Sequence, residues 1–567
     1  MTIIAITPSK KTVRVRRSVS TEHREVTMDM NVSQPTLRPR FSSDLLVFAF
    51  FAFLYLFTAS GHIESIDGNV MFAVTQNIVR SGSLSLHSAY GPVLSLVAIP
   101  FYLVGLVVTK VLHFPGDYLS KAAVSFTNAF VTALTCVLVA AVARRLGTGR
   151  RSSYVLALVY GTCTLAWPYA KTFFSEPLTA LWLLLTFWAL LHVPARIFVE
   201  DQLYRDVGFD ARGRTNSSVH HDHPVSWIIG AFAALGLGLL TRETTLITLP
   251  VFVMYLVVLT RTRPDRWRLL GAAGVTIMVS LLAVGAVNVV RFGHIGATGY
   301  TGHLWTPNVL PGLYGLLIGP YKGLILFVPL TIIAFLSWPR FYRRRAPEAL
   351  LCGGIFLVYL VVHAAYIDWP GGGNWGPRFL VPALPFLLLA LPFGWTRTPR
   401  WTTATLVLCA ASLAVQLPAI YVSYTRYEPV VGTYDDLTLM GLTTRDSLRS
   451  PIIVQWRSVP VVTDHLRDGL RDVPGARADL VQRQSAQPTV TLPPNQVLRR
   501  SITVNVPDFW FMYLSLSGHL SRALRVGVGL LGVAVLVTAA LLALLLHSMA
   551  AAPPAAQFAS RRRAGLS

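Results

Sequence analysis

The chain has 567 residues, of which 53% are hydrophobic and only 13% are charged, and its formal net charge is +23. A soluble protein carries about 25% charged residues, so the composition excludes an ordinary soluble enzyme and predicts an all-α polytopic membrane protein. Nucleic-acid binding is not expected either, because the basic residues lie in short clusters between apolar segments instead of forming a basic stripe with interleaved aromatics.

The two ends and one long internal stretch are more polar than the rest. Residues 1–43 are polar and basic, and we predict a disordered cytoplasmic N-terminus. The first apolar run begins near Leu45, too far along for an ordinary cleavable signal peptide, so it is predicted to be an uncleaved span. The expected organisation continues with a transmembrane module at 44–424, an extracytoplasmic segment at 425–521, a last membrane helix at 522–548 and a cytoplasmic tail at 549–567.

Thirteen apolar segments are candidates for membrane helices. They are 45–60, 89–112, 120–143, 153–168, 177–195, 226–241, 244–260, 269–290, 312–337, 348–367, 378–395, 402–423 and 523–547. Basic clusters mark the cytoplasmic ends, and an odd number of crossings cannot leave both termini and all these clusters inside. We predict that 89–112, with Pro92 and Pro100, lies along the outer surface without crossing. About twelve spans then remain.

This topology places several charged side chains on the extracytoplasmic side, where charge at membrane depth is costly and usually functional. Glu64 and Asp67 are three residues apart and share a face if they are helical. A carboxylate there can act as a general base on an acceptor hydroxyl, or it can be a solvated helix cap. Glu176, five residues after Lys171, is either a helix-start carboxylate or a second acid that orients the acceptor or holds a cation opposite Asp67.

Three cations on the same side lie in turns broken by Gly or Pro. Arg242 lies in "LLTRETTL", Lys322 in "IGPYKGLILFVP" and Arg378 in "GGGNWGPRFLVPALP", where Trp375 flanks it. Broken backbone at membrane depth is tolerated only against protein or a cavity. Arginine suits bidentate phosphate binding and lysine supplies a point charge. The alternatives are snorkelling and internal ion pairs, such as Arg242 with Glu243 or Arg378 with Asp368.

The sequence contains little evidence for a histidine or cysteine metal site or for a disulfide. The string "VHHDHP" at 219–224 lies in a basic cytoplasmic loop without a partner at fixed spacing, and we interpret it as a solvated loop. The four cysteines all lie in apolar segments without CxxC spacing, so they are interpreted as core residues. No cofactor is indicated with certainty, and a divalent cation at the acidic residues is the one candidate.

Seven stretches in order resemble the GT-C superfamily of polytopic glycosyltransferases, such as protein O-mannosyltransferases and aminoarabinose transferases. They are "SIDGNVMFAVTQNIVRSGSLSL", "YGPVLSLVAIPFYLVG", "RRLGTG", "SEPLTALWLLL", "GLGLLTRETTLITLP", "GPYKGLILFVP" and "GGGNWGPRFLVPALP". The resemblance covers about 45–400. It implies a bundle of about twelve transmembrane helices, with juxtamembrane helices in the first outer loop and the catalytic module in 44–424.

The resemblance also implies an activity and roles for residues. It implies an inverting hexosyl- or pentosyltransferase in the plasma (inner) membrane, with a polyprenyl-phosphate sugar as donor and a hydroxyl of a lipid-linked glycan or protein as acceptor. Asp67 would be the extracytoplasmic catalytic base and Glu176 the second acidic residue. Two departures concern the donor: Gly68 follows the Asp where many relatives have Glu, and "AYGP" stands where the aminoarabinose-transferase type has Lys-Pro. The phosphate ligand would then be Lys322 or Arg378.

Two other classes of function remain open from the sequence. One is a secondary transporter or lipid flippase, although the halves of the chain show no repeat and the charges gather at one face instead of the midplane. The other is a non-catalytic scaffold that binds partners through 425–521. That segment contains strand-like pieces, "PTVTLPP" and "RSITVNVPDFWFMYL", and is predicted to have mixed structure, as a small module or a lid.

Overall fold

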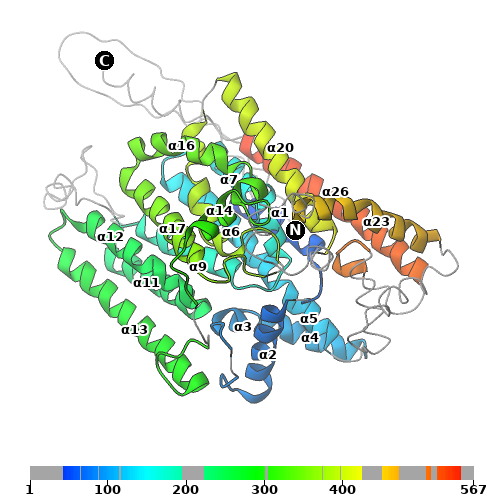
Figure 1. Ribbon diagram of the computed structural model, residues 1–567, viewed down its shortest axis with the longest axis horizontal. Coiled ribbons are helices and arrows are strands. Elements are labelled where there is room, and N and C mark those ends of the chain that lie inside the picture. Colours follow the sequence, from blue (N-terminus) through cyan, green and yellow to red (C-terminus); the bar gives the residue numbers. More distant parts are fainter. Residues whose placement is uncertain are drawn as a thin grey trace, which may run out of the picture. The chain divides into compact units, whose positions relative to one another are not determined.

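The computed structural model describes eleven ranges of the chain. They are 43–63, 65–86, 88–113, 117–193, 223–299, 304–372, 374–395, 398–423, 450–471, 506–512 and 520–550. Within these ranges the regular structure is helical, apart from one isolated antiparallel bridge between Trp305 and Tyr366. The all-α fold predicted from the composition is therefore confirmed for this part of the chain (Figure 1).

Seven helices or continuous helix pairs are long and apolar enough to cross a membrane. They are Tyr118–Arg145 (α5 and α6), α11 (Pro224–Thr241), Glu243–Thr260 (η1 and α12), α13 (Arg266–Phe292), α17 (Ala346–Ala364), α20 (Pro399–Tyr421) and Leu524–Met549 of α26 (Leu520–Ala550). Shorter apolar helices include α1 (Ser43–Thr58) and α9 (Glu176–Leu190). The helices α6 (Thr127–Arg145), α9, α11 and α13 pack in series, so α9 is surrounded by apolar neighbours. The seven spans do not establish the predicted number of twelve.

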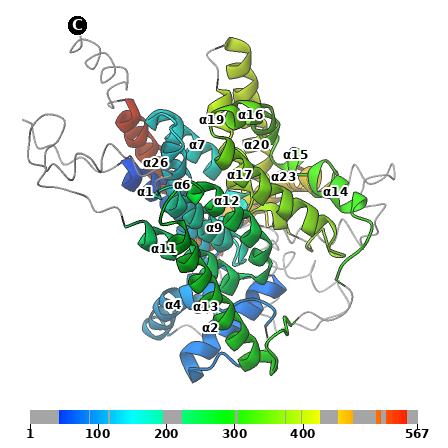
Figure 2. The ribbon, with the colours of Figure 1, turned by 90° about the vertical axis from the view of Figure 1, so that its left-hand side faces the viewer.

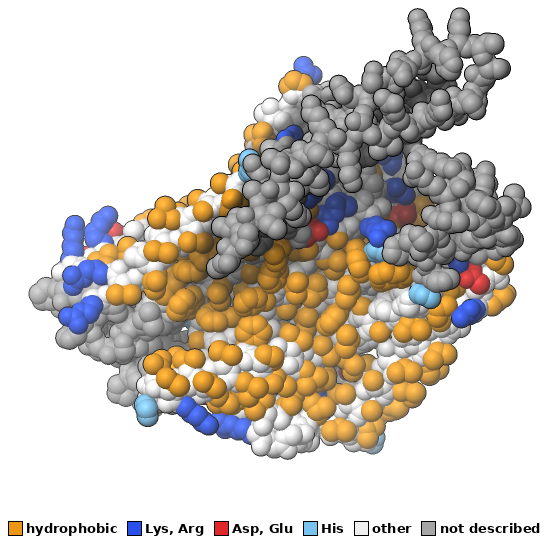
Figure 3. Space-filling view, turned by 180° about the vertical axis from the view of Figure 1, so that it is seen from behind, with side chains coloured by type: hydrophobic (Ala, Val, Ile, Leu, Met, Phe, Trp, Pro, Cys, Tyr) orange, Lys and Arg blue, Asp and Glu red, His pale blue; other side chains and the backbone are white. Residues whose placement is uncertain are grey.

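The outer surface agrees with a membrane environment. Apolar side chains cover much of the face in Figure 3, with lysine and arginine toward its edges. On α13 the exposed side chains include Val275, Met278, Val279 and Leu282. A helix that is apolar on its exposed side contacts lipid more readily than water.

The first outer loop contains the helices α2 (Ile66–Ser81), α3 (Val93–Val97) and α4 (Ile99–Val111). Ser65 caps α2 by accepting a hydrogen bond from the Gly68 amide, and Gly82 ends it with a left-handed φ of 66°. In Figures 1 and 2, α2 and α4 lie at one end of the helix bundle, opposite α16 (Thr331–Arg344). The 13 residues of α4 span about 20 Å, less than the roughly 30 Å of a hydrocarbon core. The helices α1 and α9, of 16 and 15 residues, are similarly short, so the surface position of 89–112 stays a prediction.

Labelling of single cysteines tests that topology. Cysteines at Leu86, which is exposed just before 89–112, and at His113 should both react with an impermeant maleimide in intact cells, because a segment lying along the outer surface has both ends outside. A cysteine at Arg345, after α16, serves as the cytoplasmic control and should react only after permeabilisation. Reaction at position 86 without reaction at position 113 would mean that α4 crosses the bilayer.

Two predicted spans are broken into short helices, which corrects the single apolar segments expected there. The segment 312–337 contains α14 (Leu310–Leu317), α15 (Leu324–Phe327) and the start of α16. The segment 378–395 contains η2 (Arg378–Leu380), α18 (Leu384–Leu388) and α19 (Leu391–Gly394). Pro320 and Pro329 interrupt the first, and Pro382, Pro385 and Pro392 the second, because proline has no amide hydrogen and clashes with the preceding turn.

Only parts of the predicted outer segment 425–521 are described, and they combine a long helix with the irregular stretch 506–509. The long helix is α23 (Pro451–Arg471), which packs against α20 and α26 (Figure 1). Residues 506–512 then reach the end of α1, where the Trp510 amide donates to the Ala59 carbonyl at 2.8 Å. The strand-like piece "PTVTLPP" lies outside the described residues.

Candidate functional site

Arg378 is held in a buried position by an unusual turn. The preceding turn contains Gly371, Gly372 and Gly376, with φ values of 68°, 83° and 63°, which non-glycine residues rarely adopt. Arg378 begins η2 with only 5% of its surface exposed, and its guanidinium carbon lies 4.0 Å from the centre of the Phe174 ring. A fully charged, planar donor group is therefore fixed inside the protein.

Four of the charged residues predicted from the sequence are linked by ion pairs in one cluster. Arg378 Nη1 lies 2.5 Å from Asp67 Oδ2, and Arg378 Nε donates to Glu176 Oε1. Arg242 Nη1 donates to the same Glu176 oxygen at 2.5 Å. We call Asp67, Glu176, Arg242 and Arg378 the acid–arginine cluster. Its two positive and two negative charges balance, which offsets the cost of burying them.

The two carboxylates of the cluster differ in access. The Asp67 side chain is 23% exposed, whereas that of Glu176 is 1% exposed. Glu176 Oε2 has no hydrogen-bond partner among the described residues. Asp67 can therefore reach a substrate, while Glu176 mainly holds the two arginines.

The protonation of Asp67 reflects opposing influences. Burial alone would raise its pKa, but the Arg378 guanidinium and a hydrogen bond from the Tyr90 hydroxyl hold the pKa below its usual value, and Arg242 lowers it further. Arg378 is itself buried, yet Glu176 and Asp67 raise its pKa above the ordinary value. Asp67 is thus ionised and Arg378 protonated near neutral pH.

A third carboxylate, Asp368, lies near the cluster and was considered from the sequence only as an ion-pair partner of Arg378. The structure pairs Arg378 with Asp67 and Glu176 instead. Burial raises the pKa of Asp368, and the nearby charges of Lys322 and Arg378 lower it in part. Likewise, Arg242 pairs with Glu176 and not with the adjacent Glu243.

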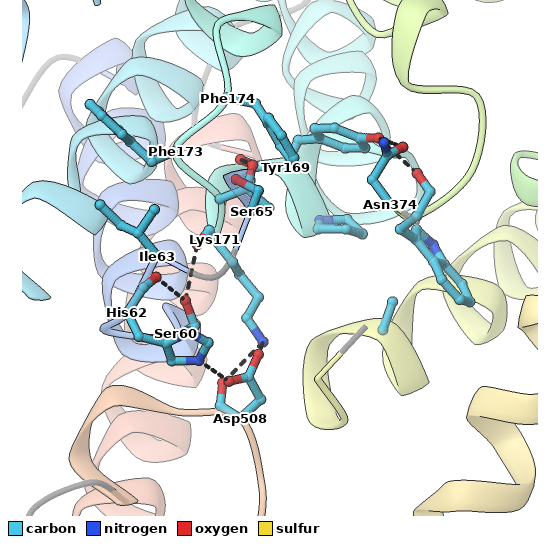
Figure 4. Close-up of a pocket in the computed structure, with 14 residues that line it drawn as sticks. Ser60, His62, Ile63, Ser65, Tyr169, Lys171, Phe173, Phe174, Asn374 and Asp508 are labelled. Atoms are coloured by element: carbon cyan, nitrogen blue, oxygen red, sulfur yellow. Dashed lines mark hydrogen bonds and ion pairs between the residues drawn. The ribbon is translucent and has the colours of Figure 1, made fainter. Parts of the chain in front are cut away.

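Lys171, predicted to bind substrate, forms a separate buried group with Asp508 and His62. Its ammonium lies 2.9 Å from Asp508 Oδ2, and His62 Nε2 lies 2.8 Å from Asp508 Oδ1. Figure 4 shows the Lys171 and His62 side chains converging on Asp508. Burial would raise the pKa of Asp508, but Lys171 and His62 hold it well below the usual range. Sequence reasoning missed Asp508, although an acid inside the aromatic run "PDFWF" was a signal.

The remaining predicted residues support the turn before Arg378. Lys322 is completely buried and donates to the Asn374 carbonyl. The Trp375 indole donates to Gln416 Oε1 at 3.2 Å, and the Tyr169 hydroxyl donates to the Trp375 carbonyl at 2.9 Å. Glu64 lies outside the described residues. Lys322 thus contacts the turn that leads to Arg378, and Trp375 lies within it.

A pocket adjoins the acid–arginine cluster. It encloses about 560 Å³, part of it open to solvent, between the loop after α1, the turn before α9 and the turn before Arg378 (Figure 4). The Phe174 ring connects the pocket with the cluster, because it lines the pocket and also stacks on Arg378. Polar and aromatic side chains share the lining, including Ser60, Ser65, Tyr169, Phe173 and Asn374. Within the described ranges, no group of three or more His, Cys, Asp or Glu residues could hold a metal.

Replacing Asp508 tests whether the C-terminal segment holds this pocket together. Asp508→Asn leaves the buried Lys171 ammonium without its carboxylate, so we expect a loss of about 3–5 kcal/mol in stability, seen as a lower melting temperature in detergent. The control Asp464→Asn changes an exposed acid on α23 and should have little effect.

The same pair predicts a pH dependence. Because folding lowers the pKa of Asp508, its contribution is present above the unfolded pKa of about 4 and is lost as the pH falls toward the folded value. The melting temperature of the wild type should therefore fall more steeply on acidification than that of Asp508→Asn. Parallel curves for the two proteins would contradict this role.

Comparison with known proteins gives similarity to solved structures only. No protein-family model and no curated protein matches the chain. ArnT from Cupriavidus metallidurans bound to undecaprenyl phosphate is similar with 15% identity and a TM-score of 0.47, over 82% of this chain and 84% of that one. Archaeal oligosaccharyltransferase AglB from Archaeoglobus fulgidus, in complex with an inhibitory peptide and a dolichol-phosphate, is similar with 11% identity and a TM-score of 0.37, over 80% of this chain and 60% of that one.

Both TM-scores lie below 0.5, so the likeness carries no assignment of residues or substrates. What the chain does must be inferred from its own site.

Proposed function

We propose that the protein is a membrane glycosyltransferase that transfers a hexose or pentose from a polyprenyl phosphate to an acceptor hydroxyl. The observation that carries this proposal is the contact of a fixed, buried Arg378 with the accessible carboxylate of Asp67, next to a pocket whose lining residue Phe174 stacks on Arg378. An anion-binding group and a base side by side suit a reaction in which a hydroxyl attacks and a phosphate leaves.

The reaction needs one displacement. The acceptor oxygen attacks the anomeric carbon, the bond from that carbon to the phosphate oxygen breaks, and the electron pair leaves with the polyprenyl phosphate. Asp67 takes the proton of the acceptor hydroxyl. Because there is a single displacement, with attack opposite the leaving phosphate, the configuration of the anomeric carbon is inverted. No general acid is needed, because the leaving group is already an anion that Arg378 can stabilise.

Donor binding and base strength are coupled in this arrangement. Without donor, Arg378 is paired with Asp67, which keeps Asp67 ionised but makes it a weak base. A donor phosphate that binds the Arg378 guanidinium weakens the ion pair between Arg378 and Asp67. The proton affinity of Asp67 then rises. Glu176 keeps Arg378 and Arg242 in place during this exchange, since it contacts both.

The location follows from the same reasoning. The basic clusters after α6 and α16, including Arg144 and Arg345, lie at helix ends opposite the end that contains α2. The positive-inside rule then supports an extracytoplasmic site. The plasma (inner) membrane is part of the same proposal, because that is where the resemblance places such transferases.

The proposal is tested by identifying the lipid that the protein retains. Protein purified in mild detergent is extracted with organic solvent, and the extract is analysed by mass spectrometry. We expect a polyprenyl-phosphate hexose or pentose, enriched over total membrane lipid, and more of it in Asp67→Asn, which binds but does not turn over. Retention of bulk phospholipid alone, in both proteins, would contradict the proposal.

A further inference from the structure

Arg291, near the end of α13, is a buried cation that the proposed chemistry does not use. It is 3% exposed, although much of α13 presents apolar side chains outward. Its guanidinium binds three carbonyl oxygens of one loop: Nη1 lies 2.5 Å from Tyr90 and 3.3 Å from Ser88, and Nε lies 3.4 Å from Leu84. An arginine buried to bind backbone carbonyls fixes the course of that loop.

A second helix also contacts this loop closely. A Cβ atom on Gly91 would lie 1.9 Å from the Leu240 carbonyl oxygen of α11, so the chain passes this helix in close contact. A small pocket, open in part to solvent, lies beside the loop and is lined in part by Tyr90, Glu243 and Arg291. Without the Arg291 side chain, the loop would border a larger empty space and could move into it.

The loop is relevant to the proposed site because it carries Tyr90. The Tyr90 hydroxyl acts on the Asp67 carboxylate and lowers its pKa, and Arg378 Nη1 lies 2.5 Å from the same carboxylate. A backbone shift at Tyr90 would move its hydroxyl relative to Asp67, and hydrogen bonds weaken steeply with distance and misalignment. Three elements therefore act in series: α13 holds the loop, the loop holds Tyr90, and Tyr90 contacts the proposed base.

We infer that Arg291 is a positioning residue that sets the Tyr90 hydroxyl against Asp67. The expected kinetic effect rests on the proposed function, but the contacts that link Arg291 to Asp67 do not depend on it. The charged and titratable groups that act on Asp67 are Arg378, Arg242, Tyr90 and Asp368, and Glu243 acts on Arg291. The path from Arg291 to Asp67 runs through the backbone and the hydroxyl of Tyr90.

The test compares Tyr90→Phe, Arg291→Gln and the double variant. Each single change removes or misplaces one donor to ionised Asp67, so the acidic limb of the pH profile of kcat/KM should move upward by about 1 pH unit. The double variant should show the same displacement, not twice as much, because both changes break one chain of contacts. Arg268→Gln, an exposed arginine at the start of the same helix, is the control and should leave the profile unchanged.

A second readout does not depend on turnover. Isotope-edited infrared titration of carboxylates, with Asp67→Asn subtracted, reports the pKa of Asp67 in the full-length protein, and it should rise in Tyr90→Phe and in Arg291→Gln. A lower melting temperature of Arg291→Gln with an unchanged Asp67 titration would overturn the positioning role. A raised pKa in a protein without any transferase activity would instead sustain it and refute the proposed function.

Discussion

Asp67→Asn is expected to reduce sugar transfer by at least about two orders of magnitude, the contribution of a general base. The amide is nearly isosteric and still accepts a hydrogen bond from Arg378, which also keeps its contact with Glu176. The variant should therefore fold and retain donor, but it cannot take the proton of the acceptor hydroxyl. Initial rates with a labelled lipid-linked sugar measure the loss.

The control for this prediction is another aspartate of the first outer loop. Asp117 is 40% exposed and forms an i,i+4 ion pair with Lys121, so Asp117→Asn should leave the rate nearly unchanged. If Asp67→Asn turns over at the wild-type rate, Asp67 is not the base. In that case Asp368, whose pKa burial raises, becomes the carboxylate to replace next.

Arg378→Ala is expected to have the second large effect, on donor binding and on stability together. The change removes the bidentate phosphate donor and also leaves the Asp67 and Glu176 carboxylates without their shared cation. We expect donor affinity to fall about 10- to 100-fold and stability to fall by about 3–5 kcal/mol. Arg378→Lys should lose less stability but still bind donor poorly, since an ammonium cannot copy the guanidinium geometry.

Glu176→Gln separates the effect of Arg378 on donor binding from its effect on stability. This variant also disrupts the buried cluster, because Glu176 contacts both arginines, but it keeps the guanidinium that would bind phosphate. It should lower the melting temperature while donor affinity stays within a few-fold of the wild type. Equal donor affinity in Arg378→Ala and wild type would show that Arg378 is only a structural ion-pair partner.

The pH dependence of activity tests the ion pair between Arg378 and Asp67 independently. Because Arg378 lowers the pKa of Asp67, the wild type should keep its activity to lower pH than an ordinary aspartate would allow. Residual activity in Arg378→Lys or Arg378→Ala should fall at a higher pH on the acidic side. A displacement toward lower pH would contradict the ion pair as the cause.

Much of the architecture could be predicted from local patterns in the sequence. Apolar runs of about 20 residues and basic clusters predict spans and their direction, since each reports only how a short segment partitions between water and lipid. The same logic predicts that 89–112 lies along the outer surface, and the structure divides this segment into α3 and α4. Topology also grouped the charged residues on one side, so Asp67, Glu176, Arg242 and Arg378 were candidates before any contact was known.

Which charges pair was decided by tertiary structure alone. Sequence proximity favoured Arg242 with Glu243, but packing of α9 beside α11 brings Glu176 to Arg242 instead. Lys171 pairs with Asp508, 337 positions later, because residues 506–512 lie between the ends of α1 and α20. Buried charges take the partner that packing brings within reach, and no local pattern encodes partners so distant in the chain.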